Sequence, residues 1–564
     1  MPSESTTLQR IRFSGISPTN YQTESFFKNG FCLEAWEQKG RACYWAKDSL
    51  SKDSVQTAEQ ATLSRDERLC SDSYFNAFFI AYWFKLTTVR NIGLRLKFSG
   101  RMKISIEAHS HLATTKTLVT ADVLHNSEQP WEAVIPADIV LDSAIRLSFT
   151  VTALSKTAIL SGGEWYTTDA PARPVSVAIV IPTFNRANYA RKTITALLGD
   201  PAVESMISRI VVIEQSDKVE LDDLAGGKCV HIRQGNLGGA GGFARGMLEC
   251  TTNPLLGEPS HLLLMDDDIM IETDSVLRVV RMAEFGSGNR VLGGGMLDLF
   301  KPNLAVALGE SNEINDFGFY ALNQVYPGAD VARPSTLNMA AIPEPVGYCA
   351  WWFCFFPIEL VHTIGLPIPC FFRGDDIQFG GRAKKAGFEP YMIPGIGLWH
   401  LPFYSKSVPW VTYFDRYNTL VGNALHGGPE ADRFFAYSVY EIRVLLARKA
   451  YAYAAAAVKA LENYLRGWEH YTERSFPAFL SEVKTFIAEF VPADSSKEGL
   501  AKLKPKGDHL ESRANAALAR YQTQAIRLQQ EFAKKMPQVY TTKAWTSYFR
   551  SGSMKEVESR ENAA

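Results

Sequence analysis

An apolar segment that runs directly into three carboxylates constrains the fold of this 564-residue chain more than any other feature. Residues 262–265, which come directly after His261, are continuously apolar. Asp266, Asp267 and Asp268 follow them without a break. A short apolar run of this kind is typical of a strand buried on both faces, as in a parallel sheet. The carboxylates would then lie at the carboxyl edge of the sheet, where open α/β folds bind their ligands.

Composition is that of a folded protein of several domains, with 46% hydrophobic and 21% charged residues. A formal net charge of −1 gives no overall field for binding nucleic acid. Eight cysteines form no CxxC pair, which predicts reduced thiols. No apolar run is long enough to span a bilayer, and the first residues lack signal-peptide features. We therefore expect a cytoplasmic protein, and peripheral contact with the inner face of the membrane is the alternative.

The first third of the chain, residues 1–172, predicts a β-sandwich. Residues 92–98 and 102–107 alternate apolar and polar side chains, and residues 99–101 between them predict the turn of a hairpin. A further alternating strand covers residues 145–151. The region holds no catalytic constellation, so a scaffold is favoured over a role in acceptor or subunit contact.

Strands alternate with helices over residues 173–428. Apolar runs at 175–181, 210–213 and 229–232 predict buried strands, and residues 190–198 have helical spacing. This order is typical of a doubly wound, nucleotide-binding α/β sheet with right-handed crossovers.

Residues 429–564 are predicted to be helical, with long helices over 433–471 and 510–535 and a frayed tail from Ser551. Lysines cluster near residues 502–506 and 534–535. A solvated helix face is the favoured interpretation, and contact with anionic lipid head groups is the alternative.

Two polar segments follow the first and third of these strands. The turn at 182–186 suits a nucleoside, and Arg186 could offer its guanidinium to a phosphate. The glycine-rich segment 234–246 lets the backbone approach a ligand closely, with a helix expected from Phe243 onward. Its spacing departs from the dinucleotide and P-loop patterns. A solvated arginine and a flexible loop are the plain structural alternatives.

The acidic triplet predicts a metal site. Adjacent carboxylates repel one another and need a counter-charge such as Mn²⁺ or Mg²⁺. Alternate members can point the same way, so Asp266 and Asp268 are the candidate ligands, and Asp267 would face the nucleotide or the fold. His400, which ends a short apolar run, could complete the ligand set with a neutral imidazole. A helix-capping acidic turn and a structural histidine are the alternatives.

A second acidic pair, Asp375-Asp376, could supply a general base that takes the proton of a sugar hydroxyl. Such a base must lie close to the diphosphate and the acceptor. The pair follows an aromatic and basic segment, Phe371-Phe-Arg373.

These segments together resemble the family 2 glycosyltransferases of the GT-A fold, and most closely the bacterial galactofuranosyltransferases that polymerise galactan. The matching motifs are Thr183-Phe-Asn-Arg186, Gly235-Asn-Leu-Gly-Gly-Ala-Gly-Gly-Phe-Ala-Arg245, Asp266-Asp-Asp-Ile269, Asp375-Asp376 and Trp399-His400. The N-terminal region also matches, at Ser73-Tyr-Phe-Asn-Ala-Phe78, Tyr82-Trp83 and Thr87-Thr-Val89.

The resemblance implies an α/β GT-A fold, a mixed nucleotide-binding sheet with flanking helices, between an N-terminal β-sandwich and a C-terminal helical region. It implies an inverting, metal-dependent transfer of galactofuranose from UDP-galactofuranose to a glycan or glycolipid acceptor in cell-surface polysaccharide synthesis. A homo-oligomer is also expected. Asp266, Asp268 and His400 would hold Mn²⁺ or Mg²⁺, and Asp376 would be the base, with Asp375 the weaker candidate.

Further roles follow from the resemblance residue by residue. Contacts with the nucleotide-sugar are expected from Pro182, Thr183, Phe184, Arg186, Glu214, Asn236, Gly238, Gly239, Arg245 and Asp267. Contacts with donor or acceptor sugar are expected from Trp351, Trp352 and Trp399. Two positions depart from the family pattern: Glu214-Gln215 replaces the usual Asp-Gln, and no tryptophan directly precedes Asp375-Asp376.

There are three alternatives to this function, and the last two are disfavoured. The enzyme could use another UDP-sugar, such as UDP-glucose, UDP-galactopyranose or a hexosamine donor. A sugar nucleotidyltransferase is disfavoured because no glycine-rich loop with a basic residue follows the first central strand. A non-catalytic carbohydrate-binding scaffold is disfavoured because both acidic clusters and His400 are present together.

Overall fold

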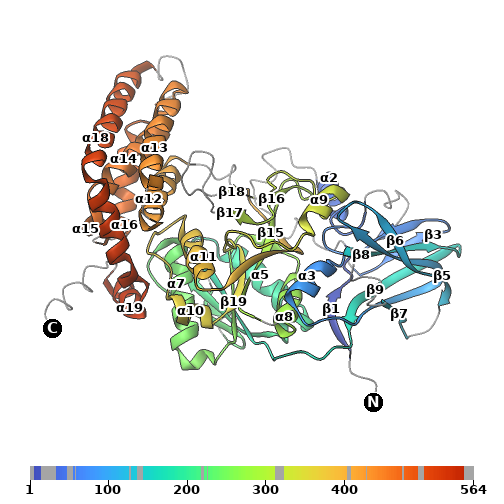
Figure 1. The fold of residues 1–564 in the computed structure, drawn as a ribbon. Helices are drawn as coiled ribbons and strands as arrows, with labels where there is room; N and C mark the ends of the chain where they lie inside the picture. The colour runs from blue at the N-terminus through green and yellow to red at the C-terminus, as the bar shows by residue number, and fades with distance from the viewer. Residues whose placement is uncertain are drawn as a thin grey trace.

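The structure is a computed structural model, and Figure 1 shows a β-rich region, a central mixed region and a helical region in chain order. It describes residues 5–13, 33–46, 55–57, 59–125, 129–135, 144–216, 221–224, 226–286, 288–311, 323–324, 326–402, 408–426, 429–472, 476–492 and 501–551. Cys32 and the tail after Ser551 lie outside these ranges. The cysteines within them are free thiols, buried except for the half-buried Cys70.

The N-terminal region is a nine-stranded sheet built around one long strand, β5. The first half of β5 pairs with β7 and β9, and its second half pairs with β6 and β8. The strands are β1 (Thr6–Arg10), β2 (Val55–Gln56), β3 (Ala61–Ser64), β4 (Arg68–Cys70), β5 (Ile92–Ser110), β6 (Thr115–His125), β7 (Trp131–Ile135), β8 (Ala144–Ala153) and β9 (Thr157–Thr167), with helices α2 (Leu33–Arg41) and α3 (Ile80–Leu86) beside them.

The predicted hairpin over residues 92–107 is wrong, whereas the strand predicted at 145–151 is confirmed as β8. Both arms of that hairpin belong to β5, which continues through the expected turn. Gly100 adopts a φ of +94° without reversing the chain. A Cβ there would lie 3.0 Å from the carbonyl oxygen of Thr157 on β9, so glycine allows the two strands to approach closely.

The central region is built on a mixed sheet with the order β12-β11-β10-β13-β19-β15-β20-β14. The first four strands are mutually parallel, and β19 joins them antiparallel. The strands are β10 (Val177–Thr183), β11 (Ile207–Glu214), β12 (Cys229–Arg233), β13 (His261–Met265), β14 (Ile269–Ile271), β15 (Arg290–Asp298), β19 (Phe353–Pro357) and β20 (Glu389–His400), with β16 (Ala305–Ala307) paired to β15 and a separate ribbon of β17 (Glu310–Ser311) and β18 (Asn323–Gln324).

Helices cover both faces of this sheet, as the continuous apolar strands predict. Along β10, Ile179 and Ile181 belong to one buried core, whereas Ala178 and Val180 belong to the other. Successive side chains of a strand point to opposite faces, so a strand buried on both faces must be apolar throughout. The helices are α5 (Ala187–Leu198), α6 (Pro201–Glu204), α7 (Gly238–Thr252), α8 (Asp274–Glu284), α9 (Pro334–Ala340), α10 (Glu359–Ile364) and α11 (Asp375–Lys385), with 3₁₀ turns η3 (Asp222–Leu224) and η4 (Pro254–Leu256).

Helix α7 begins at Gly238, earlier than the predicted start at Phe243. These glycines belong to the helix, and because they have no side chains, α7 can lie directly against β10. A Cβ at Gly242 would lie 2.5 Å from the Cβ of Pro182, and one at Gly246 would lie 2.1 Å from a methyl carbon of Val180. Much of the glycine-rich segment therefore serves close helix–strand packing rather than a flexible loop.

The C-terminal region is a bundle of helices beside the central sheet (Figure 1). Its elements are α12 (Pro409–His426), α13 (Pro429–Ala447), α14 (Tyr451–Tyr464), α15 (Gly467–Thr472), α16 (Phe476–Ala488), α18 (Lys504–Lys535), η6 (Met536–Tyr540) and α19 (Thr542–Ser551). The alanines at 454–457 are buried, which lets α14 pack tightly among its neighbours. Within the described ranges, no helix combines the length and apolarity needed to cross a membrane.

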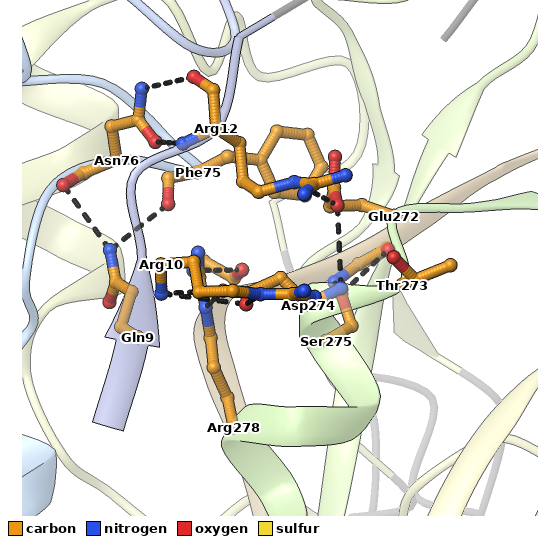
Figure 2. Close-up of polar contacts among 12 residues, drawn as sticks. Gln9, Arg10, Arg12, Phe75, Asn76, Glu272, Thr273, Asp274, Ser275 and Arg278 are labelled. Carbon is orange, nitrogen blue, oxygen red and sulfur yellow. Dashed lines mark hydrogen bonds and ion pairs between the residues drawn. The ribbon is translucent and has the colours of Figure 1, made fainter. Parts of the chain in front are cut away.

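The first strand ties the N-terminal sheet to the central region through buried charges (Figure 2). Arg10 Nε lies 2.7 Å from Asp274 Oδ1, and Arg278 Nε lies 2.6 Å from the other oxygen of that fully buried carboxylate. Arg12 pairs with Glu272 at 2.8 Å. Because Glu272 directly follows β14, these contacts hold the strand that continues from the acidic triplet.

Arg10→Ala should lower the free energy of unfolding by about 2 kcal/mol. This loss is smaller than that expected on breaking a fully buried ion pair, because Arg278 still neutralises Asp274. Urea denaturation followed by circular dichroism would measure the change. Arg101→Ala is the matched control, because the Arg101–Asp122 pair is exposed; we expect no measurable change for it. Equal losses in the two variants would contradict a stabilising role for the buried network.

Candidate active site

The acidic triplet lies between β13 and β14, at the carboxyl edge of the parallel strands, as the sequence predicts. His400 comes from the end of β20, which pairs with β14 so that Ile269 faces His400. His400 Nε2 lies 3.0 Å from Asp268 Oδ1 and 3.4 Å from Asp266 Oδ2. One ligand atom from each of the three residues lies within 4.8 Å of the others. The structure thus brings the predicted metal ligands together.

The donor set fits a divalent cation. His400 Nδ1 lies 2.7 Å from the carbonyl oxygen of Leu401, so Nδ1 donates to the backbone and Nε2 is the nitrogen that faces the carboxylates. Two carboxylate oxygens and a neutral imidazole are ligands that Mn²⁺ accepts, and Mg²⁺ accepts the carboxylates.

Asp267 points into the protein, away from this donor set. Thr183 Oγ1 donates to its carboxylate at 2.7 Å, and burial raises the pKa of Asp267 to about 7. Arg186 Nη1 lies 2.5 Å from Asp268 Oδ2 and 3.6 Å from Asp267 Oδ1, so its guanidinium offsets the charge of the triplet.

The first turn after β10 and the start of α7 line the same edge. Phe184 leaves 45% of its side chain exposed, which makes its ring available to a planar base. Asn236 Oδ1 accepts from the backbone N–H of Gly238 at 3.0 Å, so it shapes the helix start. A Cβ at Gly239 would lie 3.9 Å from Asp375 Oδ2, which places the start of α7 beside the second acidic pair.

The second acidic pair forms the first turn of α11 and follows a constrained loop. Phe371, Arg373 and Gly374 all have positive φ, between 65° and 95°. The side-chain amide of Asn418 on α12 holds this loop by donating to the carbonyl oxygens of Cys370, Phe372 and Arg373 at 2.7–3.2 Å. The loop therefore sets where Asp375 and Asp376 begin the helix.

Burial raises the pKa of both Asp375 and Asp376. The negative charge of Asp266 adds to both shifts, so the pair lies near the metal-type cluster of Asp266, Asp268 and His400. A carboxylate with a raised pKa is a stronger base once it is ionised.

Glu310 is a site residue that the sequence analysis missed. It is fully buried, and burial followed by the charge of Asp376 raises the pKa of Glu310 well above its usual value. Its Oε1 has no hydrogen-bond partner among the described residues. A single glutamate after Leu308 and Gly309 carries no pattern that would mark it, and only the folded chain places it beside Asp376.

Two of the tryptophans predicted to contact sugar have their rings enclosed in the core, and their sugar contacts stay predictions. Trp399 has no exposed surface and packs on the ring of Phe75, with centroids 5.3 Å apart. Neighbours on a strand point to opposite faces, so His400 faces the site whereas Trp399 faces the N-terminal sheet. Trp351 packs between Phe243 and Phe379.

Four other predicted residues also make contacts within the protein. Trp352 is buried and its indole nitrogen donates to the carbonyl oxygen of Gly294. Pro182 packs under Gly242. The buried carboxylate of Glu214 lies 2.8 Å from His231 Nε2. Arg245 pairs with Glu249 and lies over the ring of Phe549, so these contacts join α7 to α19 rather than to the carboxylates.

Two family models match the chain in separate regions. Residues 173–414 match "Glycosyltransferase like family 2", and residues 37–168 match "Galactofuranosyltransferase 2 N-terminal". Residues 173–414 are a glycosyltransferase domain of the family 2 type. The resemblance drawn from the motifs is confirmed, and the domain composition is that of a glycosyltransferase.

Two curated relatives are similar to this chain. Galactofuranosyltransferase GlfT2 of Mycolicibacterium smegmatis (strain ATCC 700084 / mc(2)155) is 30% identical over 420 residues, covering 71% of this chain and 64% of the relative. The protein of the same name from Mycobacterium tuberculosis (strain ATCC 25618 / H37Rv) is 30% identical over 423 residues, covering 71% and 65%. The chain therefore spans slightly less than two thirds of the length of these relatives.

Among solved structures, the chain is similar to GalNAc-T7 with UDP, GalNAc and Mn²⁺, at 12% identity and a TM-score of 0.36 over 50% of this chain and 52% of that one. The mannosyltransferase PcManGT from Pyrobaculum calidifontis, in complex with GDP-Man and Mn²⁺, gives 11% identity and a TM-score of 0.32 over 62% and 88%. With the family match and the mixed sheet, the fold is of the expected GT-A type.

Proposed function

We propose that this protein transfers galactofuranose from UDP-galactofuranose to a hydroxyl of a glycan or glycolipid acceptor, with inversion at the anomeric carbon. The observation that carries the proposal is the likeness to galactofuranosyltransferases, in the family model over residues 37–168 and in two relatives that are 30% identical over 71% of this chain. Peripheral membrane contact and a homo-oligomer stay predictions.

Asp266, Asp268 and His400 would hold Mn²⁺ or Mg²⁺, since their donor atoms already converge. A bound divalent ion would neutralise charge on the diphosphate of the leaving UDP. Arg186, which is 41% exposed and pairs with Asp268, can turn its guanidinium towards the diphosphate. The exposed ring of Phe184 would stack on the uracil.

Asp376 would take the proton of the acceptor hydroxyl. The acceptor oxygen forms a bond to the anomeric carbon while the bond from that carbon to the UDP oxygen breaks, so one displacement inverts the configuration. The proton moves to a carboxylate oxygen of Asp376. Burial raises the pKa of Asp376 and the charge of Asp266 adds to this shift, so Asp376 has a raised proton affinity. The charge of Asp376 in turn adds to the effect of burial in raising the pKa of Glu310 and Asp375.

UDP release from a panel of UDP-sugars tests the donor and the metal together. With Mn²⁺ and a galactofuranosyl acceptor present, we expect turnover of UDP-galactofuranose only, and loss of turnover with EDTA that added Mn²⁺ restores. Turnover of UDP-glucose or UDP-galactopyranose instead would contradict the galactofuranose assignment. Turnover that persists in EDTA would contradict the metal assignment.

A further inference from the structure

A cavity of about 220 Å³ lies between α11, α12 and the end of α18, outside the proposed transfer site. Its α11 wall carries Gln378, Arg382 and Lys385. The opposite walls come from α12 and from the segment that leads from α18 into η6. Gly374 and Ile377, on either side of the acidic pair, line the cavity, but Asp375 and Asp376 themselves do not, so the proposed reaction gives the cavity no role.

Two basic side chains reach the cavity without acidic partners. Arg382 donates to the carbonyl oxygens of Ile364 and Leu366, and its guanidinium lies 3.8 Å from the ring centroid of Tyr540. Burial lowers the pKa of Arg382 to about 10, so it stays charged near neutral pH. Within the described chain, neither Arg382 nor Lys385 has a carboxylate within 4.0 Å. An anion would therefore gain two unopposed positive charges.

Asn418 on α12 also lines the cavity. It is 5% exposed, and its Nδ2 donates to the carbonyl oxygens of the loop that precedes α11, which fixes the orientation of the amide. Its Oδ1 is enclosed by protein atoms and is out of reach of a ligand in the cavity. The charged groups of the site are therefore those of Arg382 and Lys385.

The remaining walls are largely apolar and leave room for a chain of carbon atoms. Ile368, Ile377, Leu425 and Met536 contribute apolar side chains. Gly422 on α12 opens the wall further, because a Cβ placed there would meet no atom within 4 Å. A helix interior ordinarily favours alanine over glycine, so this glycine keeps space open at a cost in helix stability.

We propose that this cavity binds a phosphate monoester that carries an apolar chain. Its phosphate offers the negative charge that Arg382 and Lys385 have no carboxylate to supply, together with several oxygen acceptors for their N–H groups. The second pKa of such an ester is about 6, so the ester carries at least one full negative charge at mildly acidic pH. The apolar chain would lie along the wall that Gly422 opens.

Isothermal titration of the full chain with octyl phosphate at pH 6 tests this inference without reference to transferase activity. We expect binding at least about tenfold tighter than that of inorganic phosphate, octanoate or octyl glucoside, since tenfold corresponds to only about 1.4 kcal/mol. Equal binding of inorganic phosphate would overturn the role of the apolar wall. Equal binding of octanoate would overturn the assignment of a phosphate.

Variants locate the site. Gly422→Leu should fill the cavity and weaken the binding of octyl phosphate at least about tenfold. Gly422→Ala, which helix propensity favours, should weaken this binding less. Lys385→Gln should weaken binding about threefold, a change below 1 kcal/mol that suits an exposed lysine. Lys384→Gln is the matched control, because this neighbouring lysine extends towards the carbonyl oxygen of Val346. Unchanged binding in both Gly422 variants, or equal losses in the two lysine variants, would overturn the proposal.

Discussion

Asp268→Ala is expected to lower the rate of sugar transfer by about 10³-fold or more, because a metal ion contributes several kcal/mol to stabilising the leaving group. Asp268 lies 3.0 Å from His400 Nε2 and is the most enclosed carboxylate of the metal-type cluster. Removing it takes away one ligand and leaves the guanidinium of Arg186 without its 2.5 Å partner. UDP release at saturating Mn²⁺, and Mn²⁺ titration of the free protein, would measure both effects.

The neighbouring carboxylate supplies the control for metal binding. Asp267→Asn should keep the Mn²⁺ affinity of the wild-type protein, because Asp267 accepts from Thr183 and a neutral amide oxygen can accept the same bond. Its raised pKa, about 7, means that the protein already tolerates a neutral group there. Wild-type Mn²⁺ affinity in Asp268→Ala, or an equal loss in Asp267→Asn, would show that the ligand assignment is wrong.

The convergence of the metal-type cluster could be predicted from the sequence because it depends on one topological rule. Apolar runs that end in polar residues mark buried parallel strands, and parallel strands present their carboxyl ends at one edge. Thr183, Glu214 and Met265 end three such strands in the structure. The strand that carries His400, β20, is antiparallel to β14, so this rule does not cover it. The apolar run that His400 ends marked it as a candidate edge residue, and the family motif indicated the same residue.

Local patterns failed where tertiary contacts decide the backbone. Alternation over residues 92–107 is the same for a hairpin and for one long strand, and only pairing with β6 to β9 distinguishes them. The glycines at 238–246 suggested a loop, yet the close approach of α7 to β10 makes them helical. In each case the deciding atoms come from residues far away in the sequence.

Side-chain direction and long-range pairs were the other features beyond prediction. Trp399 and His400 are adjacent, but strand alternation sends one into the core and the other to the site. Glu310 lies near Asp376, 66 residues later in the sequence, and an isolated bridge pairs Glu310 with Tyr348. The network that joins Arg10 to Asp274 spans 264 residues of sequence, so no local pattern could indicate it.

Asp376→Asn is expected to lower kcat by about 10²–10⁴-fold, the usual contribution of a general base. The amide keeps the size of the carboxylate and can still accept the backbone N–H of Ile377, 2.8 Å away, but it cannot accept a proton from the acceptor. Binding of UDP should therefore be unchanged in a direct titration. Wild-type transfer should fall as pH drops through the raised pKa of Asp376, because protonation removes the base, and the residual activity of the variant should lack this dependence.

Asp375→Asn is the comparison that assigns the base within the pair. Asp375 lies beside the start of α7, where a Cβ at Gly239 would be 3.9 Å from its Oδ2, so its side chain faces the predicted diphosphate position rather than the acceptor. We expect Asp375→Asn to raise KM for the UDP-sugar more than it lowers kcat. If instead Asp376→Asn stayed active while Asp375→Asn lost turnover and the acid limb of the pH profile, the base would be Asp375, and α11 would present its first residue to the acceptor.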